Sequence, residues 1–169
     1  SNGILFNHES PRRGETFVTK KIIKALVRIK MGYQKRLVLG NLDSKRDWGH
    51  ARDYVEAMWK ILQQKKPNDY VIATGKQHSI RQFINFVAKK LNMKIIWKGT
   101  GLNEVGYDVL NKKKIILVDK NYIRPLDVNT LLGNAAKARR ELKWKPQINI
   151  HTLIDEMIIE EMNILSNDQ

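Results

Sequence analysis

The chain has 169 residues, of which 42% are apolar and 28% charged, so it is long enough and apolar enough to bury a core. It contains no cysteine, which excludes disulfide frameworks, thiol nucleophiles and cysteine-based metal sites. Its 31 lysines and arginines stand against 17 acidic residues, and the resulting net charge of +14 fits a polyanionic partner, a phosphate-bearing ligand or a lysine-biased source.

Apolar residues recur at both strand and helix periods along the whole chain, which predicts an α/β architecture. A short strand is expected at residues 3–6 and should run into a polar loop at residues 7–14. A helix is expected at residues 16–31, where the apolar residues share one face, and Gly32 is placed to end it. Residues 36–40 form the next predicted strand.

A second charged loop is expected at residues 41–49, before a helix at residues 50–65 that Pro67 ends. The run at residues 70–75 is almost continuously apolar, as in a strand of a sheet that is covered on both faces. Ser79 is a good N-cap for the helix that follows. The remaining predicted elements are that helix at 80–91, strands at 94–98 and 113–118 with the segment between them unassigned, and helices at 134–142 and 151–165, separated by Pro146.

Several catalytic signatures are absent from the sequence. The four histidines form no closely spaced metal-binding pair, no nucleophile elbow or phosphate loop occurs, and Gly99-Thr100-Gly101 is interpreted as a turn. No tyrosine precedes a lysine by four residues, a pair that would provide an acid–base tyrosine. We therefore assign no catalytic residue and no metal ligand. With no membrane-spanning run and no secretory leader recognised, we expect a cytoplasmic protein.

The first cluster of interest is the polar segment at residues 7–14, which follows a predicted strand. Ligands of α/β proteins bind at the carboxyl ends of strands, and the adjacent Arg12 and Arg13 lie just before a helix, where they could hold a phosphate. A solvated basic loop explains the same residues equally well.

The second cluster occupies residues 41–50 and is dense in charge. Arg46 could pair with an aspartate and be offered to an anion. In the alternative interpretation, Asp47 caps the following helix and Trp48 packs in the core. Both interpretations can hold together.

The third cluster occupies residues 122–127. The position before Pro125 is held out of the α region, which gives Arg124 a restrained backbone. Asp127 could orient that arginine or accept hydrogen bonds from ligand hydroxyls, and the alternative is a plain surface salt bridge.

These clusters, in this order, resemble the C-terminal half of the GDP-mannose 4,6-dehydratases, a family of extended short-chain dehydrogenases/reductases. The resemblance implies the C-terminal part of a Rossmann-like NAD(P)-binding fold with a small substrate-binding α/β subdomain. We expect residues 1–169 to form a single substrate-binding unit from which the N-terminal cofactor-binding half is absent. The matching segments cover almost the whole chain and lie at residues 3–19, 39–51, 71–75 and 124–133.

The resemblance also implies roles for individual residues. It places NADP as the cofactor and GDP-mannose as the substrate. Asp127 replaces a usual glutamate that is expected to bind the nucleotide ribose. The implied roles are NADP contact for His8 and Arg13, sugar-diphosphate contact for Asn7, GDP binding for Lys21, Arg46 and Arg124, and a place in the pocket wall for Val18.

Resemblance assigns the complete enzyme to the lyases that convert GDP-mannose to GDP-4-keto-6-deoxymannose, a step of GDP-fucose biosynthesis. The tyrosine, lysine, glutamate and threonine of that chemistry are not found in this chain, so we expect it to be inactive alone. Without the other half, strand edges and apolar faces should be uncovered, and the chain should be oligomeric or partly disordered.

Three alternatives remain open. The chain could come from another sugar-nucleotide epimerase or dehydratase of the same fold. Its charge of +14 also fits a basic nucleic-acid-binding module, although no recognised binding motif accompanies the lysines. A third alternative is a non-catalytic partner that completes a separately encoded N-terminal half. No membrane association is expected.

Overall fold

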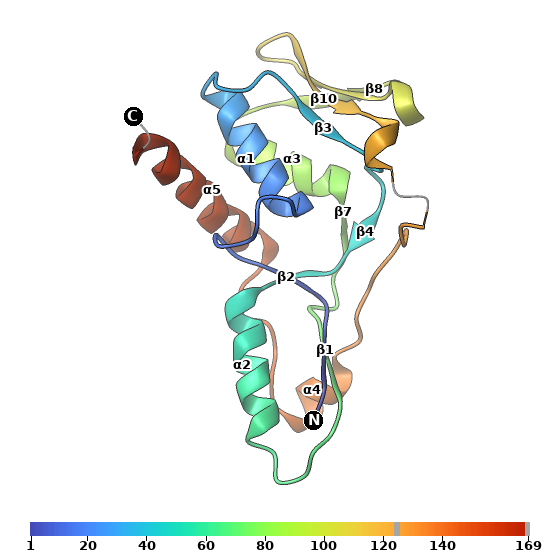
Figure 1. Ribbon diagram of the computed structural model, residues 1–169, viewed down its shortest axis with the longest axis vertical. Coiled ribbons are helices and arrows are strands. Elements are labelled where there is room, and N and C mark those ends of the chain that lie inside the picture. Colours follow the sequence, from blue (N-terminus) through green and yellow to red (C-terminus); the bar gives the residue numbers. More distant parts are fainter. Residues whose placement is uncertain (124–125, 168–169) are drawn as a thin grey trace.

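The computed structural model describes residues 1–123 and 126–167, in which helices and short strands alternate along the chain (Figure 1). The predicted α/β class is confirmed. The elements are β1 (Gly3–Leu5), β2 (Asn7–Glu9), α1 (Val18–Lys30), β3 (Leu37–Leu39), β4 (Lys45–Arg46), β5 (Trp48–His50), α2 (Ala51–Leu62), β6 (Tyr70–Ile72), β7 (His78–Ser79), α3 (Ile80–Lys90), β8 (Ile95–Lys98), β9 (Val105–Asp108), β10 (Lys113–Val118), α4 (Ala136–Glu141) and α5 (Ile150–Asn167), with 3-10 turns at Gly101–Asn103 and Lys120–Tyr122.

One region, which we call the sheet region, is built on a four-stranded sheet in the order β3-β10-β9-β8. β3 and β10 are parallel and the other pairings are antiparallel. The helices α1, α3 and α5 pack together and share one apolar core with this sheet (Figure 1). The apolar face of α1 supplies Ile22, Ile23 and Leu26, which are fully buried. The helix ends as predicted before Gly32, whose φ of +87° suits glycine.

Ion pairs of the buried Glu161 connect α5 to α1. The Glu161 carboxylate is 3.5 Å from Lys20 Nζ and 3.4 Å from Arg28 Nε, and both Glu161 and Lys20 are buried. Lys20 Nζ also donates to the Pro11 carbonyl oxygen at 3.2 Å. Lys20 therefore holds the segment that precedes α1 in place and also connects α1 to α5.

The second region, which we call the α2 region, contains the parallel pair β1–β6 with α2 and α4. Its core is a separate apolar cluster in which Tyr54, Ile72 and Trp144 are almost fully buried. Trp144 Nε1 donates to the Asp53 carbonyl oxygen at 2.8 Å, which satisfies its polar atom. Two short pairs, β2–β5 and β4–β7, lie between the two regions in Figure 1.

The predictions for the helices were confirmed to within a few residues, whereas those for the two polar segments were incomplete. Residues 7–14 were expected to be a loop but contain β2, and residues 41–49 contain β4 and the start of β5. These strands are only two or three residues long, and polar side chains give them no apolar period. Ser79 caps α3 as predicted, in a capping box with Gln82.

Candidate functional site

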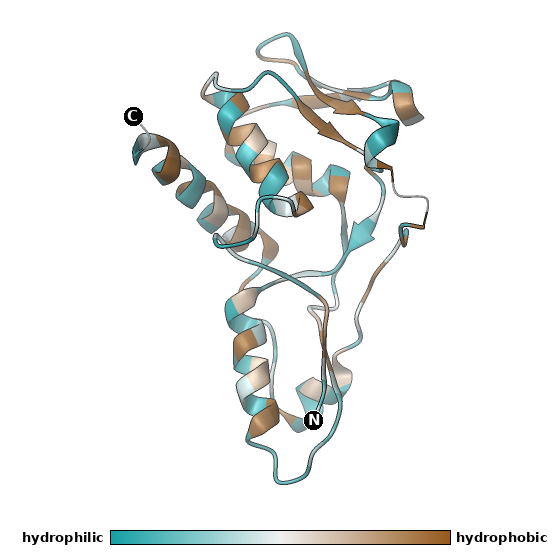
Figure 2. Cartoon of the chain, viewed as in Figure 1, coloured by the Kyte–Doolittle hydropathy of each residue, from teal (hydrophilic) through white to brown (hydrophobic). Residues whose placement is uncertain are grey.

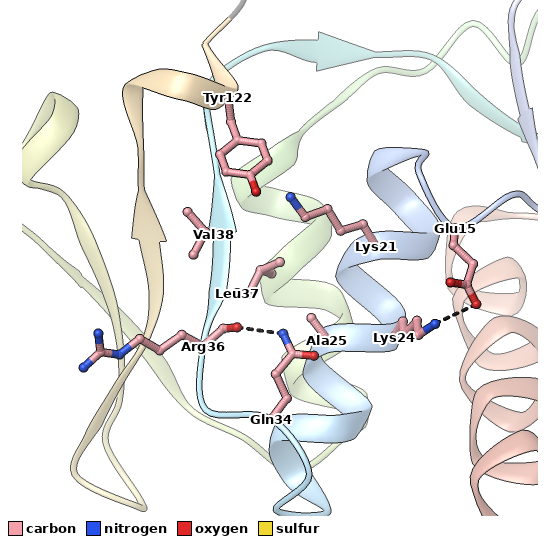
Figure 3. A pocket seen from close by; sticks show the side chains of 9 residues that line it. All are labelled: Glu15, Lys21, Lys24, Ala25, Gln34, Arg36, Leu37, Val38 and Tyr122. Atoms are coloured by element: carbon pink, nitrogen blue, oxygen red, sulfur yellow. Dashed lines mark hydrogen bonds and ion pairs between the residues drawn. The ribbon is translucent and has the colours of Figure 1, made fainter. Parts of the chain in front are cut away.

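A pocket of about 310 Å³ opens between α1, β3 and the turn at Lys120–Tyr122 (Figure 3). The turn is close to β3 because Gly40 has no side chain, and a Cβ there would overlap the Tyr122 carbonyl oxygen. The pocket residues are Glu15, Lys21, Lys24, Ala25, Gln34, Arg36, Leu37, Val38 and Tyr122.

Lys21 is the notable cation of this pocket. Its Nζ lies 3.9 Å from the centre of the Tyr122 ring, and Figure 3 shows the two side chains facing each other. Burial lowers the pKa of Lys21. Among residues 1–123 and 126–167, no carboxylate forms an ion pair with it. The fold thus holds a partly desolvated ammonium group beside an aromatic ring and leaves it to a ligand or to solvent.

The neighbouring lysine differs in this respect. Lys24 Nζ is 2.6 Å from a Glu15 carboxylate oxygen, so its charge is already balanced. Gln34 Nε2 donates to the Arg36 carbonyl oxygen at 2.7 Å. The apolar part of the pocket wall consists of Ala25, Leu37 and Val38. This apolar part of the wall, beside a lysine and an arginine that form no ion pair with the described carboxylates, suits a molecule that combines a ring with an anionic group.

Arg46 and Asp127, both predicted to bind the substrate, pair with each other. Arg46 Nη2 is 2.6 Å from Asp127 Oδ1, and Arg46 Nη1 donates to the Val128 carbonyl oxygen at 2.6 Å. Asp127 Oδ2 accepts from Ser44 Oγ at 3.1 Å. A hydrogen-bonded ion pair therefore joins the second and third sequence clusters. This agrees with the interpretation in which Arg46 pairs with an aspartate. Arg124 lies outside the described residues.

The first cluster is held by interactions within the chain. His8 Nδ1 is 2.9 Å from the Phe6 carbonyl oxygen, and its ring stacks on Tyr54 at 4.8 Å. Arg13 Nε is 3.0 Å from Glu9 Oε2, and its Cζ lies 3.5 Å from the centre of the Phe17 ring. The side chains of His8 and Arg13 are therefore held by contacts within the chain and are not fully surrounded by solvent.

Glu9 is the buried partner of that segment. It accepts a hydrogen bond from Thr19 Oγ1 at 2.7 Å in addition to the Arg13 ion pair. Burial raises the pKa of Glu9, while Thr19 and Arg13 act in the opposite direction. Asn7 is half-buried on β2, and Val18 is the half-buried first residue of α1.

Asp47 does not cap α2, contrary to one interpretation of the sequence. His50 is the N-cap, and its ring accepts from the Arg52 N–H. Asp47 is fully buried and accepts from the N–H groups of Thr74, Gly75 and Gly133 and from the Thr74 hydroxyl. Thr74 and Gly75 follow β6, and Gly133 is far from them in sequence. Asp47 therefore holds the end of β6 and the segment at Gly133 together. The other part of the interpretation, that Trp48 packs in the core, is confirmed.

The structural roles of two residues were not predicted from the sequence. Tyr122 belonged to the third cluster but had no assigned role, and its contact with Lys21 joins residues 101 positions apart. Asp47 was given a local role, and its three backbone donors are 27 to 86 positions away. The presence of an aspartate directly before the apolar Trp48 was the only available signal.

Comparison with known proteins identifies the family. A family sequence model described as GDP-mannose 4,6 dehydratase matches residues 1–157. The chain belongs to this family. GDP-mannose 4,6 dehydratase 2 of Caenorhabditis elegans is 50% identical over 99% of the chain, and the GDP-mannose 4,6-dehydratase of Sinorhizobium fredii is 50% identical over 98%. The human GDP-mannose 4,6 dehydratase is 47% identical over 97% of the chain.

The GDP-mannose 4,6-dehydratase relatives are longer than this chain. It spans 44%, 47% and 44% of the worm, bacterial and human proteins respectively. Two solved structures show the same fold at low identity. The structure of RMD from Pseudomonas aeruginosa complexed with NADPH has a TM-score of 0.77 and 21% identity over 96% of this chain and 48% of its own. The UDP-glucose 4-epimerase of Thermotoga maritima has a TM-score of 0.71 and 17% identity over 96% and 46%.

The dehydratase family is favoured over a sister epimerase because identity is near 50% for dehydratases and 17% for that epimerase. The structure also allows a test of how its residues fit a nicotinamide cofactor. The buried Arg13 Nε faces Glu9 without a well-aligned hydrogen bond, and an arginine has four further N–H donors. Arg13 therefore retains N–H donors for an anionic group of such a cofactor.

None of the helices in the described part of the chain is long and apolar enough to cross a membrane.

Proposed function

We propose that this chain is the GDP-sugar-binding portion of a GDP-mannose 4,6-dehydratase. The observation that carries the proposal is Lys21, a half-buried cation without a carboxylate partner among the described residues, in a pocket whose wall is partly apolar. A nucleoside diphosphate combines a flat ring with anionic oxygens, and this is the combination that the pocket and Lys21 accommodate. The family match supports GDP-mannose as the sugar nucleotide.

Each predicted residue has a role in this proposal. Lys21 neutralises the diphosphate, with Tyr122 as part of the pocket wall. Val18 lies on the same helix, is not among the residues that line this pocket, and is proposed to extend the wall. Arg46 and Asp127 form a pre-oriented pair that binds the nucleotide together with Arg124. Asn7 lies beside the sugar diphosphate, and His8 and Arg13 lie at the margin of the NADP site. The pairing of Arg46 with Asp127 supports this role, because a held guanidinium loses less conformational freedom on binding.

The resemblance to the family implies the reaction of the complete enzyme, and the chemistry of the sugar explains the order of its steps. Oxidation at C4 creates a ketone, which acidifies the proton at C5, so a base can remove it and water can leave across C5 and C6. When bound, NADP would accept the hydride from C4 and return it to C6, while a proton returns to C5. Residues of this chain bind and orient the substrate. The product is a GDP-4-keto-6-deoxymannose in a cytoplasmic route to GDP-fucose.

The proposal is tested by calorimetric titration of the purified chain with GDP, GDP-mannose and GMP. GDP and GDP-mannose should bind weakly, GMP more weakly still, and Lys21→Met should reduce the affinity for GDP at least tenfold. Lys24→Met is the matched control, because Lys24 lines the same pocket but is already paired with Glu15. Equal losses in the two variants, or no binding at all, would contradict the proposal.

A titration with duplex DNA at two salt concentrations separates the nucleic-acid alternative. Counterion release makes DNA binding fall steeply with salt, whereas the binding of a single nucleoside diphosphate by a few basic residues should change less. Tighter binding of DNA than of GDP-mannose at both salt concentrations would favour a nucleic-acid module. The isolated chain should show no dehydratase turnover, and measurable turnover would mean that the proton-transfer groups lie within it.

A further inference from the structure

Six exposed lysines gather at one end of the sheet region, which we call the basic end. Because β3 and β10 are parallel, the loop that precedes β3 and the turn that precedes β10 lie at the same edge of the sheet (Figure 1). Val109, in that turn, donates its N–H to the Lys94 carbonyl oxygen at 2.8 Å, which brings the start of β8 to this edge as well. The six residues are Lys30, Lys35, Lys94, Lys112, Lys113 and Lys114.

The charge of the basic end is not balanced within the described part of the chain. No carboxylate of the described residues forms an ion pair with any of these lysines. The stretches that contain them, residues 28–42 and 86–118, include only two acidic residues, Glu104 and Asp108. Glu104 pairs with Arg81, and the buried Asp108 accepts hydrogen bonds from the turn itself. The positive charge is therefore left to solvent or to a partner.

Large apolar side chains are exposed among these lysines. Met31 and Tyr33 follow Lys30 at the end of α1 and are 54% and 55% exposed. Leu110, in the turn before β10, is 64% exposed, and Figure 2 shows hydrophilic residues around it in the same turn. A single exposed apolar residue is common on a protein surface, but these lie on two neighbouring segments of one charged edge. The basic end thus combines positive charge with exposed apolar side chains.

The aromatic rings of β8 and β9 are not open to a stacked base. Lys98 Nζ lies 5.2 Å from the centre of the Tyr107 ring, and Arg81 Cζ lies 4.7 Å from the centre of the Trp97 ring. Proteins that bind single-stranded nucleic acid without sequence preference stack its bases on exposed aromatic side chains. Because cations of the chain already lie over these two rings, the sheet does not favour a nucleic acid as the partner.

We propose that the basic end binds the surface of a membrane that contains anionic phospholipids. Lysines near such a surface are attracted to its negative potential, and exposed apolar side chains enter the boundary between headgroups and acyl chains. Binding of this kind needs no membrane-spanning helix. It departs from the sequence-based expectation of no membrane association, which considered only spanning runs and leaders. No residue of the basic end lines the pocket that is proposed to bind GDP, so the two sites can be tested separately.

The test measures co-sedimentation of the purified chain with phosphatidylcholine vesicles that contain or lack phosphatidylserine. The chain should bind only the vesicles with phosphatidylserine, and added salt should reduce binding because it screens the attraction. Lys113→Gln together with Lys114→Gln should lower the partition coefficient at least tenfold, since each lysine near an anionic surface contributes about fivefold. Leu110→Ser should lower it about threefold without a change of charge, because less apolar surface enters the bilayer.

Lys65→Gln together with Lys66→Gln is the matched control. These two lysines are exposed and form no ion pair with a described carboxylate. They lie in the loop between α2 and β6, at the opposite end of the molecule from the basic end (Figure 1). Both double substitutions lower the net charge by the same amount, but the control should change binding by less than about twofold, because distant charges are screened.

Equal losses in the two double variants would overturn the basic end as the binding surface and would indicate attraction by the net charge alone. No binding to vesicles with phosphatidylserine, or tighter binding of a single-stranded RNA in the same salt, would also overturn the proposal. Unchanged binding by Leu110→Ser would overturn the insertion of apolar side chains. Each variant should keep the thermal unfolding midpoint of the unmodified chain, because every replaced side chain is exposed.

Discussion

The sheet region and the α2 region differ in how completely their apolar surfaces are covered. In the sheet region, α1, α3 and α5 enclose a single core, and Ile22, Phe83 and Ile154 are fully buried. In the α2 region, a small core is complete on one side, while β1 pairs only with β6 among the described strands and α2 carries an exposed apolar stripe. The stripe consists of Val55, Met58, Trp59 and Leu62. The sheet region buries most of its apolar residues within this chain, whereas the α2 region leaves part of its apolar surface exposed to solvent.

This difference predicts an unequal distribution of stability. Burial of apolar surface provides most of the favourable free energy of folding, so a residue enclosed in the sheet region should contribute far more than one in the stripe. Local opening should begin where backbone groups and apolar side chains meet solvent, which is at β1 and α2.

Phe83→Ala should have the largest effect. Phe83 is fully buried in the core of the sheet region and packs against Trp48, with ring centres 5.1 Å apart. We expect the free energy of unfolding to fall by about 3–5 kcal/mol in urea denaturation, because truncation removes transferred surface and leaves a cavity. Trp59→Ala is the control, and we expect a change within about 0.5 kcal/mol. Equal losses would show that the stripe is already buried in this chain.

Asp47→Ala should come next, because it removes a connection between distant segments. Four donors from Thr74, Gly75 and Gly133 would lose their acceptor in a buried position. We expect a loss on the order of 2–4 kcal/mol in the free energy of unfolding. Exposed Asp43, which pairs with Arg81, provides the control Asp43→Ala, with an expected loss below about 1 kcal/mol. A mild effect of Asp47→Ala would mean that water satisfies the donors.

The contrast between Phe83 and Asp47 also shows which structural features can be predicted from the sequence and which cannot. Apolar spacing places Phe83 on the inner face of a helix, and the Ser79 cap and the Gly32 end are local patterns, so these features were predictable. The role of Asp47 depends on residues as far away as Gly133, and such long-range partners leave no local pattern. For the same reason, Lys21 was assigned to the site by resemblance, but its contact with Tyr122 was not foreseen.

The buried Glu9 should give the chain a pH-dependent stability. Burial raises its pKa above the ordinary value of 4.5, so the folded state favours the protonated form more than the unfolded state does. Its contribution to stability is therefore fully present below about pH 4.5 and is lost as the pH rises through the raised value. Urea denaturation from pH 4 to 8 should show that Glu9→Gln is less sensitive to pH than the unmodified chain. Identical pH profiles would contradict the raised pKa.

Lys21→Met should have the smallest effect on folding and the opposite sign. Burial lowers the pKa of Lys21, so the folded chain disfavours its charged form, and a neutral apolar side chain of similar length relieves that cost. We expect a slightly higher midpoint of urea denaturation without ligand, together with the loss of GDP affinity proposed above. Lys24→Met should instead lower the midpoint slightly, since it breaks the pair with Glu15. A residue that reduces stability but is needed for binding is typical of a ligand site, whereas a lysine with only a structural role would lower the midpoint when replaced.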